Sequence, residues 1–207
     1  MKKYLMLIIS ILALATNTFA QNAEQVFKAA VDKLKSYDNI EIAFDYRMIN
    51  TAAGIDELMT GTGHLQGDSY KLNIAGQEMI CDGTTLWTYM PDSQEVMISS
   101  VDSEGGGSPL SIINSYYDNI NAKFLNGNDM SRMSIEVTPK EKDENFNRLV
   151  VIIGTKTMEL KEVHLFDNND SEFVYSITKF ITNQVLPDNF FTFNEQDYPD
   201  AEIIDMR

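Results

Sequence analysis

The 207-residue sequence has one cysteine, two histidines and few basic residues. Cys81 has no partner for an internal disulfide, and we expect it to be buried beside Ile80, because a free cysteine behaves as a small hydrophobic side chain. His64 and His164 fall in separate predicted strands, and no histidine or cysteine spacing resembles a zinc site. No nucleophile motif, phosphate-binding loop or dinucleotide fingerprint is present. The sequence therefore favours binding over catalysis and predicts no enzyme, metal or other cofactor.

Positive charge is also scarce, with 16 Lys and Arg against 31 Asp and Glu, for a net charge of −15. This charge opposes binding to nucleic acid or to an anionic membrane surface. Residues 1–20 have a basic start, an apolar centre and a small residue at Ala20, which predicts a signal peptide cleaved after Ala20. No later apolar run reaches membrane-spanning length. We expect residues 21–207 to form a single exported, soluble domain without stable membrane insertion.

Alternating apolar residues dominate the first half of that domain. Residues 40–48 have the clearest period of two and predict a long, half-buried strand. A second strand follows over 56–66, where Gly61 and Gly63 weaken it or mark a bulge. Consecutive hairpins continue to residue 100. With about ten strands in all, one antiparallel sheet would curl on itself, so we expect a mainly β, α+β fold: a strongly curved, incomplete barrel with helices over its concave face.

Two helices are expected, one before the first strand and one after the run of hairpins. Asn22 is a good N-cap with Gln25 as its capping-box partner, and an apolar stripe predicts a helix over 23–36 that packs on the sheet. The glycines at 105–107 precede Ser108 and Pro109, which suit a helix start. The apolar segment that follows, up to residue 117, is either a connection that merely packs or a movable flap.

The hairpin over residues 79–91 is the centre of the sequence. Asp82-Gly83 between two apolar runs predicts a two-residue type I′ turn. Trp87 and Tyr89 share one face of the second strand, and these large rings are either core aromatics of the sheet or part of a binding wall. The acidic turn at 167–170 invites a calcium site, but Glu172 stands where a calcium loop needs glycine, so we expect no calcium there.

Residues 81–91 resemble a segment of the LolA family, the periplasmic carriers of outer-membrane lipoproteins, whose pattern is S-D-G-x-x-L-W-x-Y-x-P. Other matching stretches follow in order over residues 21–207: Leu34-x-x-Tyr37, Ile42-Ala43-Phe44, Pro109-Leu110-Ser111-Ile112-Ile113, Phe191-Thr192-Phe193 and Ile203-Ile204-Asp205. The ordered set is more specific than any one motif.

The resemblance implies an incomplete β-barrel with a helical lid over an apolar cavity. That cavity takes the acyl chains of lipoproteins released by an inner-membrane transporter and passes them to an outer-membrane acceptor. We expect a periplasmic monomer that uses a lid of Leu110, Ile112 and Ile113. The cavity wall is expected to consist of Phe44, Tyr46, Tyr70, Leu72, Trp87 and Tyr89.

One departure from the family leaves the cargo open. Well-known members carry an arginine before a Pro-Asn turn, and that arginine is thought to latch the lid. Here the corresponding turn is Gln66-Gly67-Asp68, without a cation. The alternative is therefore a periplasmic binding module of the same fold for another lipid or hydrophobic ligand. An exported hydrolase is a third hypothesis, which a substrate screen would test.

Overall fold

The computed structural model describes residues 22–101, 113, 116–125, 130–141 and 146–207. The predicted signal peptide (1–20) and most of the predicted apolar flap, including Leu110 and Ile112, lie outside the described residues.

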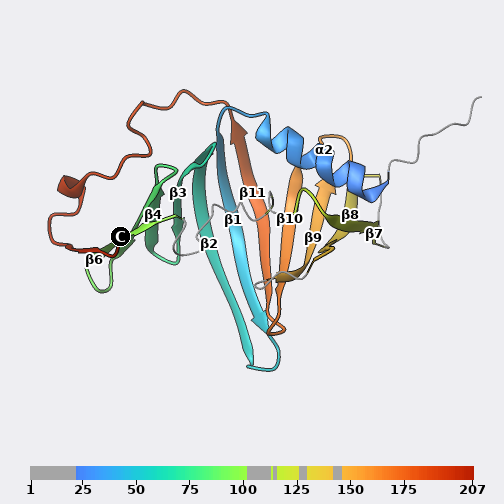
Figure 1. Cartoon of the computed structure of the whole chain (residues 1–207), viewed down its shortest axis with the longest axis horizontal. Helices are drawn as coiled ribbons and strands as arrows, with labels where there is room; N and C mark the ends of the chain where they lie inside the picture. The colour runs from blue at the N-terminus through green and yellow to red at the C-terminus, as the bar shows by residue number, and fades with distance from the viewer. Residues whose placement is uncertain (1–21, 102–112, 114–115, 126–129, 142–145) are drawn as a thin grey trace, which may run out of the picture.

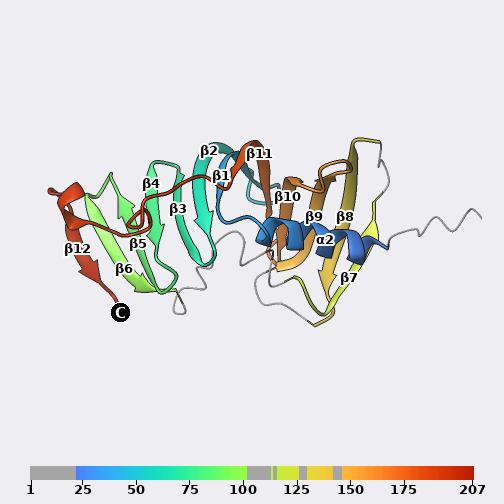
Figure 2. The ribbon, with the colours of Figure 1, turned by 90° about the horizontal axis from the view of Figure 1, so that it is seen from above.

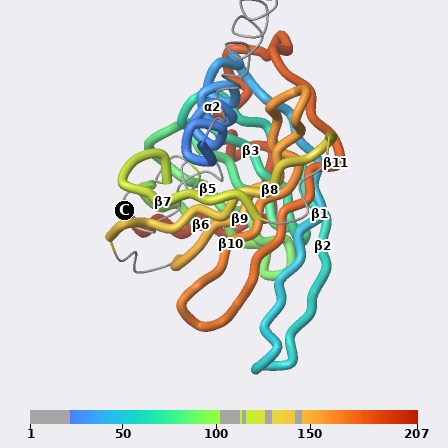
Figure 3. Tube along the Cα trace, turned by 90° about the vertical axis from the view of Figure 1, so that its right-hand side faces the viewer, coloured from blue at the N-terminus to red at the C-terminus, as the bar shows by residue number. Residues whose placement is uncertain are grey.

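Twelve strands form one sheet, which runs from β12 at one end to β7 at the other (Figure 1, Figure 2). In spatial order, the strands are β12 (Glu202–Asp205), β6 (Glu95–Ser100), β5 (Thr85–Met90), β4 (Gln77–Cys81), β3 (Ser69–Ile74), β2 (Ile55–Gln66), β1 (Ile40–Asn50), β11 (Glu172–Thr182), β10 (Leu160–Asp167), β9 (Phe146–Gly154), β8 (Arg132–Pro139) and β7 (Ile120–Phe124). The sheet is not closed into a barrel, and the hairpin of β1 and β2 extends beyond its neighbours (Figure 3).

The prediction of a purely antiparallel sheet is wrong at one edge. β12 pairs with β6 in parallel, from Glu202 opposite Glu95 to Asp205 opposite Ile98. The reason is a long return of the chain. After β11, residues 183–201, here called the C-terminal segment, pass from the middle of the sheet to its far edge (Figure 1). A hairpin would have forced an antiparallel pair, whereas this long connection does not.

The helix α2 (Ala23–Lys35) begins and packs as the sequence predicts. The Asn22 side chain accepts from the Gln25 N–H at 2.7 Å, and the Gln25 side chain accepts from the Asn22 N–H at 3.4 Å. The apolar stripe of α2, including the fully buried Phe27 and Val31, enters the core beside strands β8, β9 and β10. The Lys33 ammonium also donates to the carbonyl of Thr157 at 2.5 Å, in the turn before β10.

The strand register defines two faces of the sheet. Directly paired residues point to the same side, so one face carries Ile40, Leu65, Tyr70, Cys81 and Leu86 in a row across β1 to β5. These five side chains are buried in the same cluster as α2. We call this side the inner face. The opposite side, the outer face, carries the residues that alternate with them.

The hairpin around Asp82 differs from its predicted turn. β4 ends at Cys81 and β5 begins at Thr85, so the loop has three residues, and only Gly83 among them has positive φ, at 97°. The Asp82 carboxylate accepts from the N–H groups of Thr84 and Thr85 at 2.9 and 2.8 Å. This side-chain cap replaces the type I′ geometry, in which both central residues need positive φ.

The two-residue turn with two positive φ values lies one hairpin earlier. Ala75 (φ 53°) and Gly76 (φ 79°) connect Ile74 of β3 to Gln77 of β4. Alanine tolerates the left-handed region less well than asparagine or aspartate, so the dipeptide gives a weaker sequence signal than Asp-Gly.

Candidate functional site

The inner face continues from the α2 core as an apolar surface. Phe44 on β1 and Leu72 on β3 are buried to 5% and 8% exposure, and Tyr46 is half-buried. The Tyr46 ring lies 5.0 Å from the ring of Tyr175 and 6.4 Å from that of Phe173, both on β11. Within the fully described strands β1 to β5, Glu57 is the one charged residue whose register places it on this face. Such a surface can bind apolar groups and has no means of holding a charged ligand at its centre.

Two glycines give this surface its smooth contour over β2. A methyl group on Gly61 would lie 2.4 Å from Cζ of Phe44, and one on Gly63 would lie 2.6 Å from Cδ2 of Leu72. Phe44 and Leu72 therefore lie across β2, over backbone that carries no side chain. The register of β1 with β2 is unbroken through both glycines, so the alternative of a bulge is wrong, and close packing is their role.

The hydroxyl groups of Tyr46 and Tyr175 on the inner face are held in their neutral form. Burial, together with the neighbouring Tyr46, raises the pKa of Tyr175 well above its ordinary value. Burial and the carboxylate of Glu57 raise the pKa of Tyr46. Both side chains therefore stay uncharged at any physiological pH and add only a small polar edge to an apolar wall.

The structure divides the cavity wall predicted from the sequence. Phe44, Tyr46, Tyr70 and Leu72 share the inner face, whereas the register places Trp87 and Tyr89 on the outer face. The prediction that all six line one wall is therefore corrected for these last two. On β5 the inner-face positions belong to Leu86, Thr88 and Met90.

Trp87 and Tyr89 are covered by the C-terminal segment. The Trp87 ring stacks on Phe193 with centroids 5.6 Å apart, and Tyr89 lies 4.9 Å from Tyr198. The Tyr198 hydroxyl donates to Glu78 at 2.8 Å. These contacts hold the C-terminal segment against the outer face. Trp87 and Tyr89 therefore have a structural role.

The start of the C-terminal segment is held by the buried side-chain amide of Asn39, just before β1. Its Nδ2 donates to the carbonyl of Gln184 at 2.8 Å, and its Oδ1 accepts from the Gln184 N–H at 2.9 Å. These two hydrogen bonds engage both backbone groups of Gln184, so this residue is held in one register against the start of β1.

The one described residue of the predicted lid, Ile113, is buried to 7% exposure in the core cluster with Tyr116. Burial there fits both alternatives for this segment, a packed connection and a lid, and the lid stays a prediction. Tyr117 lies beneath the ammonium groups of Lys35 and Lys28, at 4.4 and 5.3 Å from its ring centroid, and so joins this region to α2.

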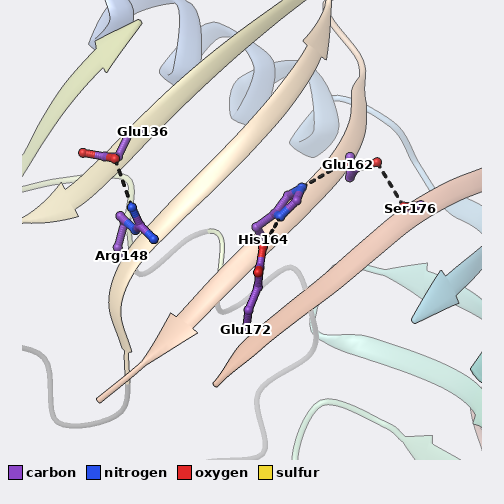
Figure 4. A network of polar contacts seen from close by, with 6 residues as sticks. All are labelled: Glu136, Arg148, Glu162, His164, Glu172 and Ser176. Carbon is purple, nitrogen blue, oxygen red and sulfur yellow. Dashed lines mark hydrogen bonds and ion pairs between the residues drawn. The ribbon is translucent and has the colours of Figure 1, made fainter. Parts of the chain in front are cut away.

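The outer face carries a polar network that sequence reasoning missed (Figure 4). His164 on β10 contacts Glu172 through Nδ1 and Glu162 through Nε2, both at 2.6 Å. Ser176 donates to Glu162 at 3.1 Å, away from the imidazole, so the group has no activated nucleophile. Among the residues that the structure describes, no group of three or more His, Cys, Asp or Glu is placed to hold a metal ion. The spacing of Glu162 and His164 places both side chains on the outer face of β10, which the sequence could have revealed. Glu172 comes close to His164 only through the pairing of β10 with β11.

A comparison with models of known protein families assigns this chain to one of them. Residues 74–194 match the family model described as outer membrane lipoprotein carrier protein LolA. The chain belongs to the LolA family. The matched range includes the Asp82 hairpin and most of the C-terminal segment.

A curated LolA relative and three solved structures give the extent of the similarity. The outer-membrane lipoprotein carrier protein of Albidiferax ferrireducens is 27% identical over 124 residues, which span 56% of this chain and 58% of that protein. An uncharacterised conserved protein of Thermus thermophilus has a TM-score of 0.54 at 8% identity, over 87% of this chain and 98% of the other. This likeness shows the fold alone.

Two further solved structures have lower scores. A LolA superfamily protein of Nitrosomonas europaea has a TM-score of 0.45 at 12% identity, over 84% of this chain and 99% of the other. The lipoprotein LppX of Mycobacterium tuberculosis has a TM-score of 0.47 at 11% identity, over 80% of this chain and 97% of the other.

Within the described part of this LolA-family chain, no helix is long and apolar enough to cross a bilayer.

Proposed function

We propose that this LolA-family protein is a periplasmic carrier that binds the acyl chains of lipoproteins on its inner face and shuttles them from the inner to the outer membrane. The observation that carries the proposal is the apolar inner face, which presents Phe44, Tyr46 and Leu72 over a stretch of β2 without side chains at Gly61 and Gly63. A carrier of this kind acts as a monomer, and its only chemistry is binding and release. An inner-membrane transporter loads it and an outer-membrane acceptor unloads it.

The magnitude of the hydrophobic effect suits an open surface better than a closed one. Each buried CH₂ contributes about 0.8 kcal/mol, so a fully buried sixteen-carbon chain gains roughly 12 kcal/mol. Two or three such chains would exceed about 20 kcal/mol, the practical ceiling of non-covalent affinity. A sheet that is not closed, with half-buried Tyr46 and Ile74 on its inner face, covers acyl chains only in part and lets them leave.

A second candidate is a carrier of the same fold for another lipid. The turn after β2, Gly67-Asp68, has no cation before it, since Gln66 is the last residue of the strand. The lid-latching arginine of well-known family members therefore has no counterpart at this turn. In this protein, α2 is tied instead by Lys33 to the carbonyl of Thr157.

Mass spectrometry of molecules that co-purify with the protein from its native cell envelope tests both candidates. Acylated lipoproteins support the first and a free lipid supports the second, while a preparation without any acyl-bearing molecule contradicts both. Ile74→Glu places a charge on the inner face and is expected to abolish co-purification. Asn73→Glu, one residue earlier and exposed on the outer face, is the matched control and is expected to retain it.

A further inference from the structure

Methionines are concentrated on the inner face. Eleven methionines occur in the sequence, two of them in the first twenty residues. Of the remaining nine, five share the inner face of β1, β2, β4, β5 and β6, as the register shows: Met48, Met59, Met79, Met90 and Met97. We call these five the methionine band.

The methionine band is neither core nor free surface. All five side chains are half-buried. Met130 and Met206, outside the band, are 91% and 48% exposed. Met79 of the band packs against the core cluster, as do Met133 and Met158 outside it. Thioethers at the border of an apolar surface adapt to irregular apolar groups and remain within reach of small solutes.

We propose that the methionine band is a modification site at which small two-electron oxidants, such as hydrogen peroxide or hypochlorous acid, switch off binding of acyl chains. The inference rests on the proposed function of the inner face. With hydrogen peroxide, the thioether sulfur attacks one peroxide oxygen, so an S–O bond forms and the O–O bond breaks. The sulfur loses two electrons and becomes a sulfoxide, and the departing hydroxide takes the remaining peroxide proton and leaves as water.

The surroundings of two band residues, Met48 and Met90, make a sulfoxide costly once a ligand covers it. The directly paired neighbours of Met48 are Glu57 and Phe173, and the neighbour of Met90 on β6 is Glu95. The other three band residues lie opposite hydroxyl groups, Met59 opposite Tyr46 and both Met79 and Met97 opposite Thr88. At Met48 and Met90, where no hydroxyl or amide side chain is directly paired, an acyl chain lying over a sulfoxide would bury an unpaired, strongly polar oxygen. Oxidation therefore weakens ligand binding while the core, which holds the fold, stays apolar.

Peptide mass spectrometry combined with binding of a fluorescent sixteen-carbon fatty acid tests the inference. The purified protein is treated with increasing hypochlorous acid, the sulfoxides are mapped, and the Kd for the probe is measured before and after. We expect sulfoxides at the five band methionines, and the probe to bind at least about tenfold more weakly once they have formed. Treatment with methionine sulfoxide reductases A and B, one for each epimer, is expected to restore the original Kd.

Two variants separate the band from other methionines. In a variant with all five band methionines changed to Leu, we expect the ratio of Kd after and before oxidation to stay near one. In the control variant Met130→Leu with Met206→Leu, the loss is expected to match the wild type, because both residues are exposed and neither belongs to the band. Circular dichroism checks that each variant is folded.

The outcomes separate this inference from the proposed function. Failure of the unoxidised wild type to bind the probe overturns the proposed function. Binding that survives oxidation of the band, or an equal loss in the five-Leu variant, overturns the modification site alone.

Discussion

At the level of single residues, Gly61 is the described glycine at which an added Cβ would meet the shortest contact, the ring of Phe44. A Cβ on Gly61 would meet Cζ of Phe44 at 2.4 Å and the carbonyl oxygen of Asn73 at 3.1 Å. We predict that Gly61→Ala lowers the free energy of unfolding by about 1–3 kcal/mol, because the ring must leave its place. Urea unfolding monitored by circular dichroism measures the change.

A double-mutant cycle shows whether the ring is the cause. In a Phe44→Ala background, the main obstacle to the new methyl group is gone, so Gly61→Ala is expected to cost at least about 1 kcal/mol less. An equal cost in both backgrounds would show that Asn73 or the strand itself, and not Phe44, requires glycine at this position.

Asp82 gives the hairpin a pH-dependent contribution to stability. Burial acts to raise the pKa of its carboxyl group, but the N–H groups of Thr85 and Thr84 donate to it, and the net pKa lies below the ordinary value. Because the folded-state pKa is lower than that of the unfolded chain, about 3.9, this contribution is present above pH 3.9. It is lost as the pH falls through the folded-state pKa.

We predict that Asp82→Asn destabilises the protein at pH 7, and that the difference from wild type narrows as the pH falls from 5 to below 3. Urea midpoints at several pH values measure it. A difference that is constant over this range would mean that the turn does not depend on the charge of Asp82.

Among the elements, the C-terminal segment has the clearest optical reporter. Trp87 is the only tryptophan of the chain and stacks on Phe193 with an interplanar angle of 12°. We predict that Phe193→Ala shifts the Trp87 emission to longer wavelength, since the indole loses its cover, and lowers the free energy of unfolding by about 1–2 kcal/mol. Phe191→Ala, in the same segment but packed on Phe190, is the matched control and is expected to leave the emission unchanged. Unchanged emission in Phe193→Ala would contradict the stacking.

The helix and most strands could be predicted from the sequence because their signals are local. The Asn22 cap and its apolar stripe specify α2 within one residue of its observed end, and alternation specifies β1. The face that Trp87 occupies could not be predicted in this way. It depends on the register of β5 and on the C-terminal segment, which lies about a hundred residues later in the chain and buries the face that would otherwise be solvent-exposed.

The parallel edge strand escaped prediction for the same reason. Four residues, Glu202–Asp205, carry no signal for strand direction, and the direction follows from where the C-terminal segment ends. The register places Phe44, Tyr46, Tyr70 and Leu72 on one face, because β1 and β3 alternate clearly and both pair with β2. That they line an acyl-binding surface stays a prediction.

On the scale of the whole molecule, the sheet separates two surfaces with different roles. The inner face is apolar and is covered by α2 at one end, while the outer face is fastened by aromatic contacts in one half and by the His164 network in the other. Such a protein can leave its inner face partly open without losing its fold. The C-terminal segment and the His164 network hold the strands together from the outer side.

The most direct test of this account is photo-crosslinking from the two faces to an acylated lipoprotein. Benzoylphenylalanine replaces Thr88, half-buried on the inner face of β5, or Thr62, exposed on the outer face of β2. The account predicts crosslinks to the acyl chains from position 88 and none from position 62. Crosslinks from position 62 alone, equal crosslinks from both, or none from either would contradict the assignment of the inner face as the binding surface.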